Sequence, residues 1–100
     1  MAEPTFLDEA IEEVVDAVSR YELVADVATA RRLFTEAKDI VQRVLESPRR
    51  WPVEENGFRR WRLEGFPYSW RYEVDDIGNV RFIAFVHARR RPGYFKRRGR

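Results

Sequence analysis

The sequence predicts a single α+β domain in which an N-terminal helical hairpin packs on a small antiparallel β-sheet. Apolar residues recur at three- and four-residue steps up to residue 46, which is the period of a helix, and alternate from residue 59 onward, which is the period of a strand. A chain of 100 residues, 44% of them hydrophobic, has the size and the apolar content for one core. We therefore expect one domain over residues 1–100, ending in a basic tail at about residues 88–100.

Two amphipathic helices are expected, at residues 8–21 and 27–46, with a short connector between them. Asp26 or Thr29 can cap the second helix, and Ser47-Pro48 ends it because the residue before a proline disfavours the α conformation. So short a link should make the two helices an antiparallel hairpin. The apolar residues expected on the core side are Leu7, Ala10, Ile11, Val14, Val18 and Tyr21 in the first helix and Ala30, Leu33, Phe34, Ala37, Ile40, Val41, Val44 and Leu45 in the second.

Three strands are expected in the second half, at residues 59–64, 68–75 and 80–87. Trp61 and Trp70 fall on the faces expected to be buried. The last strand is almost continuously apolar and should therefore be central, and alternation would place His87 on the same face as Phe85 and Ile83. Residues 2–7 are expected to add an edge strand before the first helix.

Charge is divided unevenly along the chain. Residues 1–46 hold eleven acidic and five basic residues, a net charge of −6, whereas residues 47–100 hold six acidic and fourteen basic residues, a net charge of +8. A basic half of this kind should attract an anionic partner. The alternative is a solvated surface whose helical acids lie at one end.

Composition also argues against several classes of protein. Without cysteine the chain can form neither disulfides nor a thiolate zinc site, and no two carboxylates have metal-ligand spacing, so we expect no metal and no cofactor. No uncharged apolar run approaches the roughly 20 residues that span a bilayer, and the first residues lack the layout of a signal peptide. We therefore expect a cytoplasmic protein that does not contact membranes.

Two arginines on the first strand form one candidate site. Alternation places Arg60 and Arg62 on the face opposite Trp61 and Leu63, with the two arginine side chains roughly 6–7 Å apart. Guanidinium groups at this spacing can hold one phosphate group or two neighbouring ones. The alternative is a pair of solvated arginines on an exposed sheet face.

His87 and two aromatic residues of the tail are further candidates. His87 ends the last strand and could act as a general acid or base near neutral pH, or could be a packed or capping residue. Tyr94 and Phe95 lie between the basic residues of the tail and could stack on a nucleic acid, or could fold back over the open sheet face while the arginines stay solvated. We expect both behaviours in part, with the rings packed and the charges attracting a partner.

Several short motifs occur in an order that resembles a known family. They are Glu46-Ser47-Pro48, Arg49-Arg50-Trp51-Pro52, Arg60-Trp61-Arg62-Leu63, Phe66-Pro67-Tyr68, Tyr72-Glu73-Val74 and His87-Ala88-Arg89-Arg90-Arg91-Pro92-Gly93-Tyr94. Over nearly its whole length the chain resembles the RelE/ParE superfamily of toxins from type II toxin–antitoxin systems, particularly members described as plasmid stabilisation proteins. The resemblance implies a growth-inhibiting toxin that a cognate antitoxin neutralises.

The resemblance leaves the target open. ParE-like members poison DNA gyrase, whereas RelE-like members enter the ribosome and cut messenger RNA as metal-independent endoribonucleases. A non-toxic member that only binds antitoxin is a third possibility. We prefer the gyrase target because Ser69 occupies a position at which the RelE-type pattern has an arginine, although Arg71 on the same strand face could replace it.

The resemblance also implies site residues. In a nuclease, Arg60, Arg62 and Arg89 would stabilise the charge of the transition state, and His87 or Tyr94 would have to transfer protons, because guanidinium groups stay protonated. The residues expected to bind the target are Arg71, Arg90, Arg91, Lys96, Arg97 and Arg98.

Overall fold

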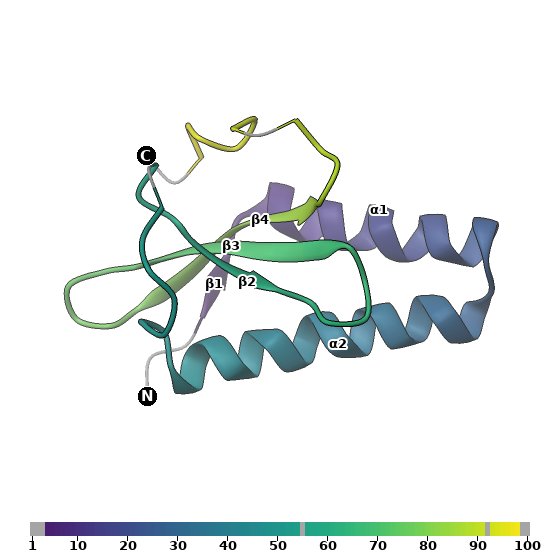
Figure 1. Cartoon of the computed structure of the whole chain (residues 1–100), viewed down its shortest axis with the longest axis horizontal. Coiled ribbons are helices and arrows are strands. Elements are labelled where there is room, and N and C mark those ends of the chain that lie inside the picture. The colour runs from purple at the N-terminus through teal and green to yellow at the C-terminus, as the bar shows by residue number, and fades with distance from the viewer. Residues whose placement is uncertain (1–3, 55, 92, 99–100) are drawn as a thin grey trace.

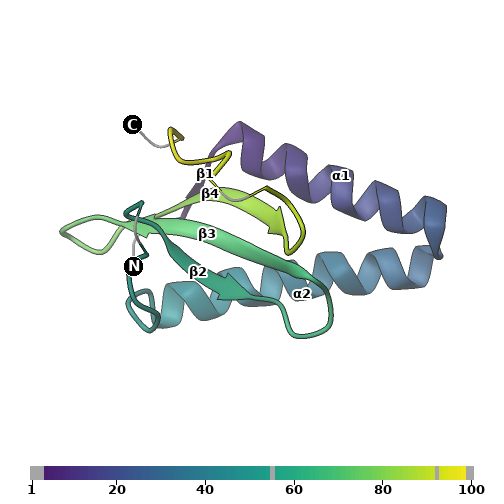
Figure 2. The same ribbon diagram turned by 45° about the horizontal axis from the view of Figure 1, so that its top comes forward.

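The arrangement of helices and strands comes from a computed structural model that describes residues 4–54, 56–91 and 93–98. The elements follow one another as β1 (Thr5–Phe6), α1 (Asp8–Val24), α2 (Val27–Glu46), β2 (Arg59–Arg62), β3 (Tyr68–Val74) and β4 (Val80–His87). The two helices run antiparallel along one face of the sheet (Figure 1, Figure 2). The predicted α+β fold with an N-terminal helical hairpin is confirmed.

The first helix is longer than expected, and both helices bury narrower stripes. α1 continues to Val24 because no glycine or proline interrupts residues 22–25. Asp26 then caps α2, since its Oδ1 accepts the backbone N–H of Thr29 at 2.6 Å. Ile11 and Phe34 were expected to face the core but are 48% and 43% exposed, so for these two residues the prediction was wrong.

The sheet is mixed, and this corrects the expectation of a purely antiparallel one. Over the described residues the strand order is β1-β4-β3-β2, with antiparallel β2–β3 and β3–β4 pairs and a parallel β1–β4 pair. The expected edge strand at residues 2–7 is therefore present as β1, although residues 2 and 3 lie outside the described residues. β2 ends at Arg62 because the backbone N–H groups of Glu64 and Gly65 donate to the Glu36 carboxylate.

A β-bulge in β4 changes which residues share a face. Arg71 lies opposite Ala84 but Tyr72 lies opposite Phe82, so Ile83 is the additional residue. Phe85 therefore packs on the helix side of the sheet, whereas Ile83 packs on the other side. The expectation that Ile83 shares a face with His87 and Phe85 was wrong, because it assumed unbroken alternation.

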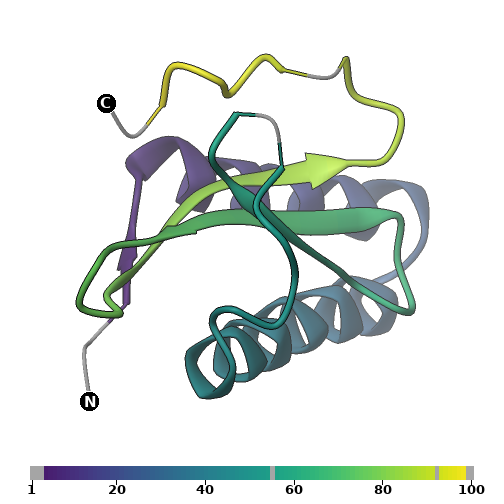
Figure 3. The ribbon, with the colours of Figure 1, turned by 60° about the vertical axis from the view of Figure 1, so that its left-hand side comes forward.

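Apolar residues are buried on both faces of the sheet. The larger cluster lies between the sheet and the helices and includes Trp61 and Trp70, as predicted. On the other face the tail crosses the sheet (Figure 3), and Phe95 is only 3% exposed. Its neighbours in this second cluster are Phe58, Ile83, Ala84 and Val86. The aromatic part of the tail thus folds back over the sheet face that the helices leave open.

Candidate functional site

A basic groove lies on the sheet face that carries the tail. It has a volume of about 750 Å³ and is bounded by β2, β3, the end of β4 and the tail. It brings together three of the expected catalytic residues, Arg60, Arg62 and His87. Of the residues expected to bind the target, Arg71, Arg90 and Lys96 line the same groove.

Arg60 and Arg71 share one carboxylate at this groove. They face each other across β2 and β3, and the carboxylate of Glu54 lies 3.1 Å from Arg60 Nη2 and 2.8 Å from Arg71 Nη1. The side chain of Arg71 is 15% exposed, and its guanidinium lies over the ring of Phe95 at 5.2 Å. Burial lowers the pKa of Arg71, and the negative charge of Glu54 opposes this shift. Arg62, by contrast, is exposed and lies opposite Ser69.

The ring of His87 is held by contacts with Arg89 and Tyr68. Its Nδ1 accepts the backbone N–H of Arg89 at 3.0 Å, and its ring meets the ring of Tyr68 edge to face at 5.0 Å. A neutral imidazole with Nδ1 as acceptor carries its proton on Nε2. In this arrangement His87 therefore presents a hydrogen-bond donor rather than a basic lone pair.

A second depression, of about 580 Å³, lies between α1 and the tail and holds other expected catalytic residues. Arg89 and Tyr94 line it, whereas Arg60 and Arg62 do not. His87 and Arg90 border both depressions. The five residues expected to act together in a nuclease are thus divided between two surfaces that meet at His87.

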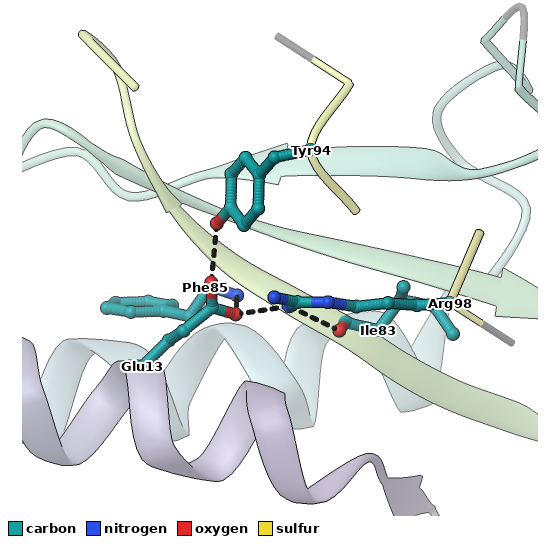
Figure 4. Close-up of polar contacts among 5 residues, drawn as sticks. All are labelled: Glu13, Ile83, Phe85, Tyr94 and Arg98. Carbon is teal, nitrogen blue, oxygen red and sulfur yellow. Dashed lines mark hydrogen bonds and ion pairs between the residues drawn. The ribbon is translucent and has the colours of Figure 1, made fainter. Parts of the chain in front are cut away.

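Glu13 of α1 fixes Tyr94 and Arg98 to the body of the protein (Figure 4). Its carboxylate accepts the hydroxyl of Tyr94 at 2.6 Å and lies 2.7 Å from Arg98 Nη1. It also accepts the backbone N–H of Phe85 at 3.2 Å. Burial, and then the hydrogen bond to Glu13, raises the pKa of Tyr94 well above its usual value. Near neutral pH the phenol is therefore protonated and cannot accept a proton.

The other described basic residues of the tail lie at the surface. Arg89, Arg91 and Arg97 are exposed. Arg90, also exposed, lies with its guanidinium 4.3 Å from the centre of the Tyr94 ring. Three residues of the tail contact the rest of the domain, namely Tyr94, Phe95 and Arg98. The tail therefore combines anchoring residues with exposed cations.

The sequence analysis missed Glu13 and Glu54, which both organise the site. Glu13 is one of several acids in α1 with similar helical positions, and Glu54 lies in the loop before β2. Their partners are distant in sequence, 81 residues from Glu13 to Tyr94 and 17 residues from Glu54 to Arg71. Among the described residues no group of three or more metal-ligating side chains is found, and none of the helices is long and apolar enough to cross a membrane.

Comparison with known proteins identifies the fold. No protein-family model and no curated protein sequence matches the chain. A chain from a solved structure described as "Chromosomal ParDE TA system from P. aeruginosa" superposes with a TM-score of 0.75 at 16% sequence identity, covering 87% of this chain and 96% of that one. The architecture of two helices on a mixed four-stranded sheet is therefore similar to the fold of that chain. In particular, the chain has the fold of a chain from a ParDE system.

Proposed function

We propose that this protein is the toxin of a type II toxin–antitoxin pair, that it inhibits growth by poisoning DNA gyrase, and that a cognate antitoxin neutralises it. The observation that supports the proposal is the ParE-like fold, which covers 87% of this chain and 96% of the related ParDE chain. Fold alone does not define chemistry, so the choice of target rests on the site.

The site favours a protein-binding poison over a nuclease. Metal-free cleavage of RNA requires groups that accept and donate protons at the reacting oxygens. His87 uses Nδ1 to bind the Arg89 backbone, and the hydroxyl of Tyr94 donates to Glu13. Neither group is available as a base in this arrangement. Binding to a protein target needs only exposed charges and shape, which the groove and the tail supply.

A RelE-like endoribonuclease is the second candidate because one observation favours it. Arg60, Arg62 and His87 line a single basic groove, where two guanidinium groups could stabilise a phosphorane-like transition state. In that function Arg89 would have to move toward the groove, and Tyr94 would have to leave Glu13 before it could transfer a proton.

The antitoxin would meet two kinds of surface. Exposed apolar side chains on the hairpin, among them Ile11, Val15 and Phe34, suit the apolar face of an amphipathic helix. The basic groove suits acidic residues that extend from that helix. Attraction between opposite charges should speed association, so added salt should lower the association rate more than it raises the dissociation rate.

Controlled expression in a bacterium tests the proposal. Production of the chain alone should arrest growth, and co-production of the antitoxin encoded beside it should restore growth. Purified protein should inhibit supercoiling by gyrase, and messenger RNA should remain uncut on ribosomes. Leu33→Asp provides the inactive control, because Leu33 is 0% exposed and an unpaired charge there should unfold the chain.

The alternative outcomes are distinct. Cleavage of messenger RNA that is lost in the Arg60→Ala/Arg89→Ala double variant, with antitoxin affinity retained, would establish the nuclease and refute the gyrase target. Normal growth together with tight antitoxin binding would indicate a non-toxic antitoxin-binding protein. Normal growth with no binding of the neighbouring gene product would refute the toxin proposal itself.

A further inference from the structure

Two arginines occupy directly opposed positions on neighbouring strands. Arg60 on β2 pairs in register with Arg71 on β3. Like charges at facing positions of an antiparallel pair repel each other, and Arg71 is shielded from water, with 15% of its side chain exposed. This pair is therefore stable only with a negative group beside it.

Glu54 is that negative group in this structure, and its side chain can leave without unfolding its loop. Among the described residues, the backbone of the loop is held by hydrogen bonds from Glu54 N–H to the Phe58 carbonyl at 2.8 Å and from Gly57 N–H to the Glu54 carbonyl at 2.9 Å. The side chain itself is 33% exposed. Rotation of this side chain toward solvent would uncover both guanidinium groups while the backbone bonds remain.

The groove holds far more positive charge than one carboxylate balances. Among the described residues that line it, Glu54 is the single carboxylate. The cationic residues that line it are Arg60, Arg62, Arg71, Arg90 and Lys96. In addition, the buried Nε of Arg71 has no hydrogen-bond partner among the described residues. A ligand with more negative charge and more acceptor oxygens than a carboxylate would satisfy this surface better.

We propose that the Arg60–Arg71 pair is a binding site for a phosphate group and that Glu54 occupies it until a phosphate-bearing ligand displaces the carboxylate. Guanidinium groups bind phosphate through paired N–H donors. Because a ligand must compete with Glu54, a single phosphate binds weakly. A ligand with several phosphates also meets Arg62, Arg90 and Lys96 and is therefore selected. A polyphosphorylated small molecule and a nucleic acid both offer this chemistry.

Binding of tripolyphosphate to the purified full-length chain, measured by calorimetry at fixed ionic strength, tests the proposal. Glu54→Gln removes the competing charge and should tighten binding about tenfold, the order expected when one charged hydrogen bond no longer has to be displaced. Glu64→Gln is the matched control, because it changes the net charge equally at a side chain that is 84% exposed. It should change affinity by no more than about twofold. Equal affinities of the two variants would overturn the proposal.

Arg60→Gln gives a second, independent test. This variant leaves the contact between Glu54 and Arg71 in place and should weaken tripolyphosphate binding about tenfold. Unchanged binding by Arg60→Gln would overturn the proposal even if Glu54→Gln failed to fold. A parallel titration with a single-stranded RNA oligonucleotide distinguishes the sources. A gain by Glu54→Gln for both ligands shows that the phosphate group suffices, whereas a gain for tripolyphosphate alone identifies a small polyphosphate as the ligand. Because these readouts are affinities, they stand apart from any result on toxicity.

Discussion

Replacement of Glu13 by alanine should destabilise the whole domain, because one carboxylate joins three parts of it. Glu13 lies on α1, and it accepts hydrogen bonds from the β4 backbone at Phe85 and from Tyr94 and Arg98 of the tail. Among the described residues, β1 pairs with Arg81 and Phe82 of β4. At Phe85, farther along the same edge of β4, Glu13 supplies the hydrogen-bond acceptor that a strand partner would otherwise provide.

The magnitude follows from burial and from the number of bonds lost. The side chains of Glu13 and Arg98 are 16% and 18% exposed, so the bonds are largely but not fully shielded from water. A hydrogen bond to a charged group contributes about 1.5–3 kcal/mol. Water entering the vacated space would satisfy part of the three donors, so we expect Glu13→Ala to lower the free energy of unfolding by about 3 kcal/mol.

Urea unfolding followed by circular dichroism measures this loss. Glu12→Ala is the matched control, because Glu12 is the exposed neighbour on the same helix, and it should change stability by no more than about 0.5 kcal/mol. Tyr94→Phe removes one of the three donors and should cost about 1 kcal/mol. The Glu13→Ala/Tyr94→Phe double variant should lose less stability than the sum of the two single losses, because both substitutions remove the same hydrogen bond. A Glu13→Ala loss no larger than that of Glu12→Ala would refute the reasoning.

Three further predictions concern stability. Tyr72→Phe should raise the free energy of unfolding by about 1 kcal/mol in urea, because the buried Tyr72 hydroxyl has no hydrogen-bond partner among the described residues. Burial raises the pKa of Tyr68, Tyr72 and Tyr94 above the ordinary value of 10.0, and it raises that of Tyr72 to about 12. The folded state therefore keeps these protons at a pH at which the unfolded state releases them. The free energy of unfolding should be constant just below pH 10 and should fall from pH 10 to 12. The fall should be less steep in Tyr72→Phe. Gly78→Ala should cost about 1 kcal/mol in thermal unfolding because Gly78 has φ +92°, whereas Asp76→Ala at the exposed neighbouring position should have little effect.

The elements of the fold were predictable because their signals are local. Periodicity gave both helices and the three long strands, and a capping aspartate marked the start of α2. β1 contains two residues, too few for a periodic signal to show that it pairs in parallel with β4. The bulge at Ile83 depends on the register between β3 and β4, which alternation within a single strand does not contain.

The candidate site was predictable only where one strand determines it. Alternation placed Arg60 and Arg62 on the same side, and both line the groove. The acids that engage the predicted basic residues could not be selected, because α1 carries several carboxylates and only the folded chain brings Glu13 to Tyr94. Glu54 could not be selected either. Its partner Arg71 lies on β3, whereas the strand that follows Glu54 directly in sequence is β2.

The ion pairs within the protein change how the uneven distribution of charge along the chain is interpreted. An acidic first half and a basic second half suggest a surface for an external anion, but part of the attraction is internal. Glu13 in the first half binds Arg98 in the second, and Glu54 lies between Arg60 and Arg71. Near the groove and in the described part of the tail, the cations that remain exposed to a partner are Arg62, Arg89, Arg90, Arg91, Lys96 and Arg97. An acidic partner would meet these exposed cations first and would reach both guanidinium groups of the Arg60–Arg71 pair only by replacing Glu54.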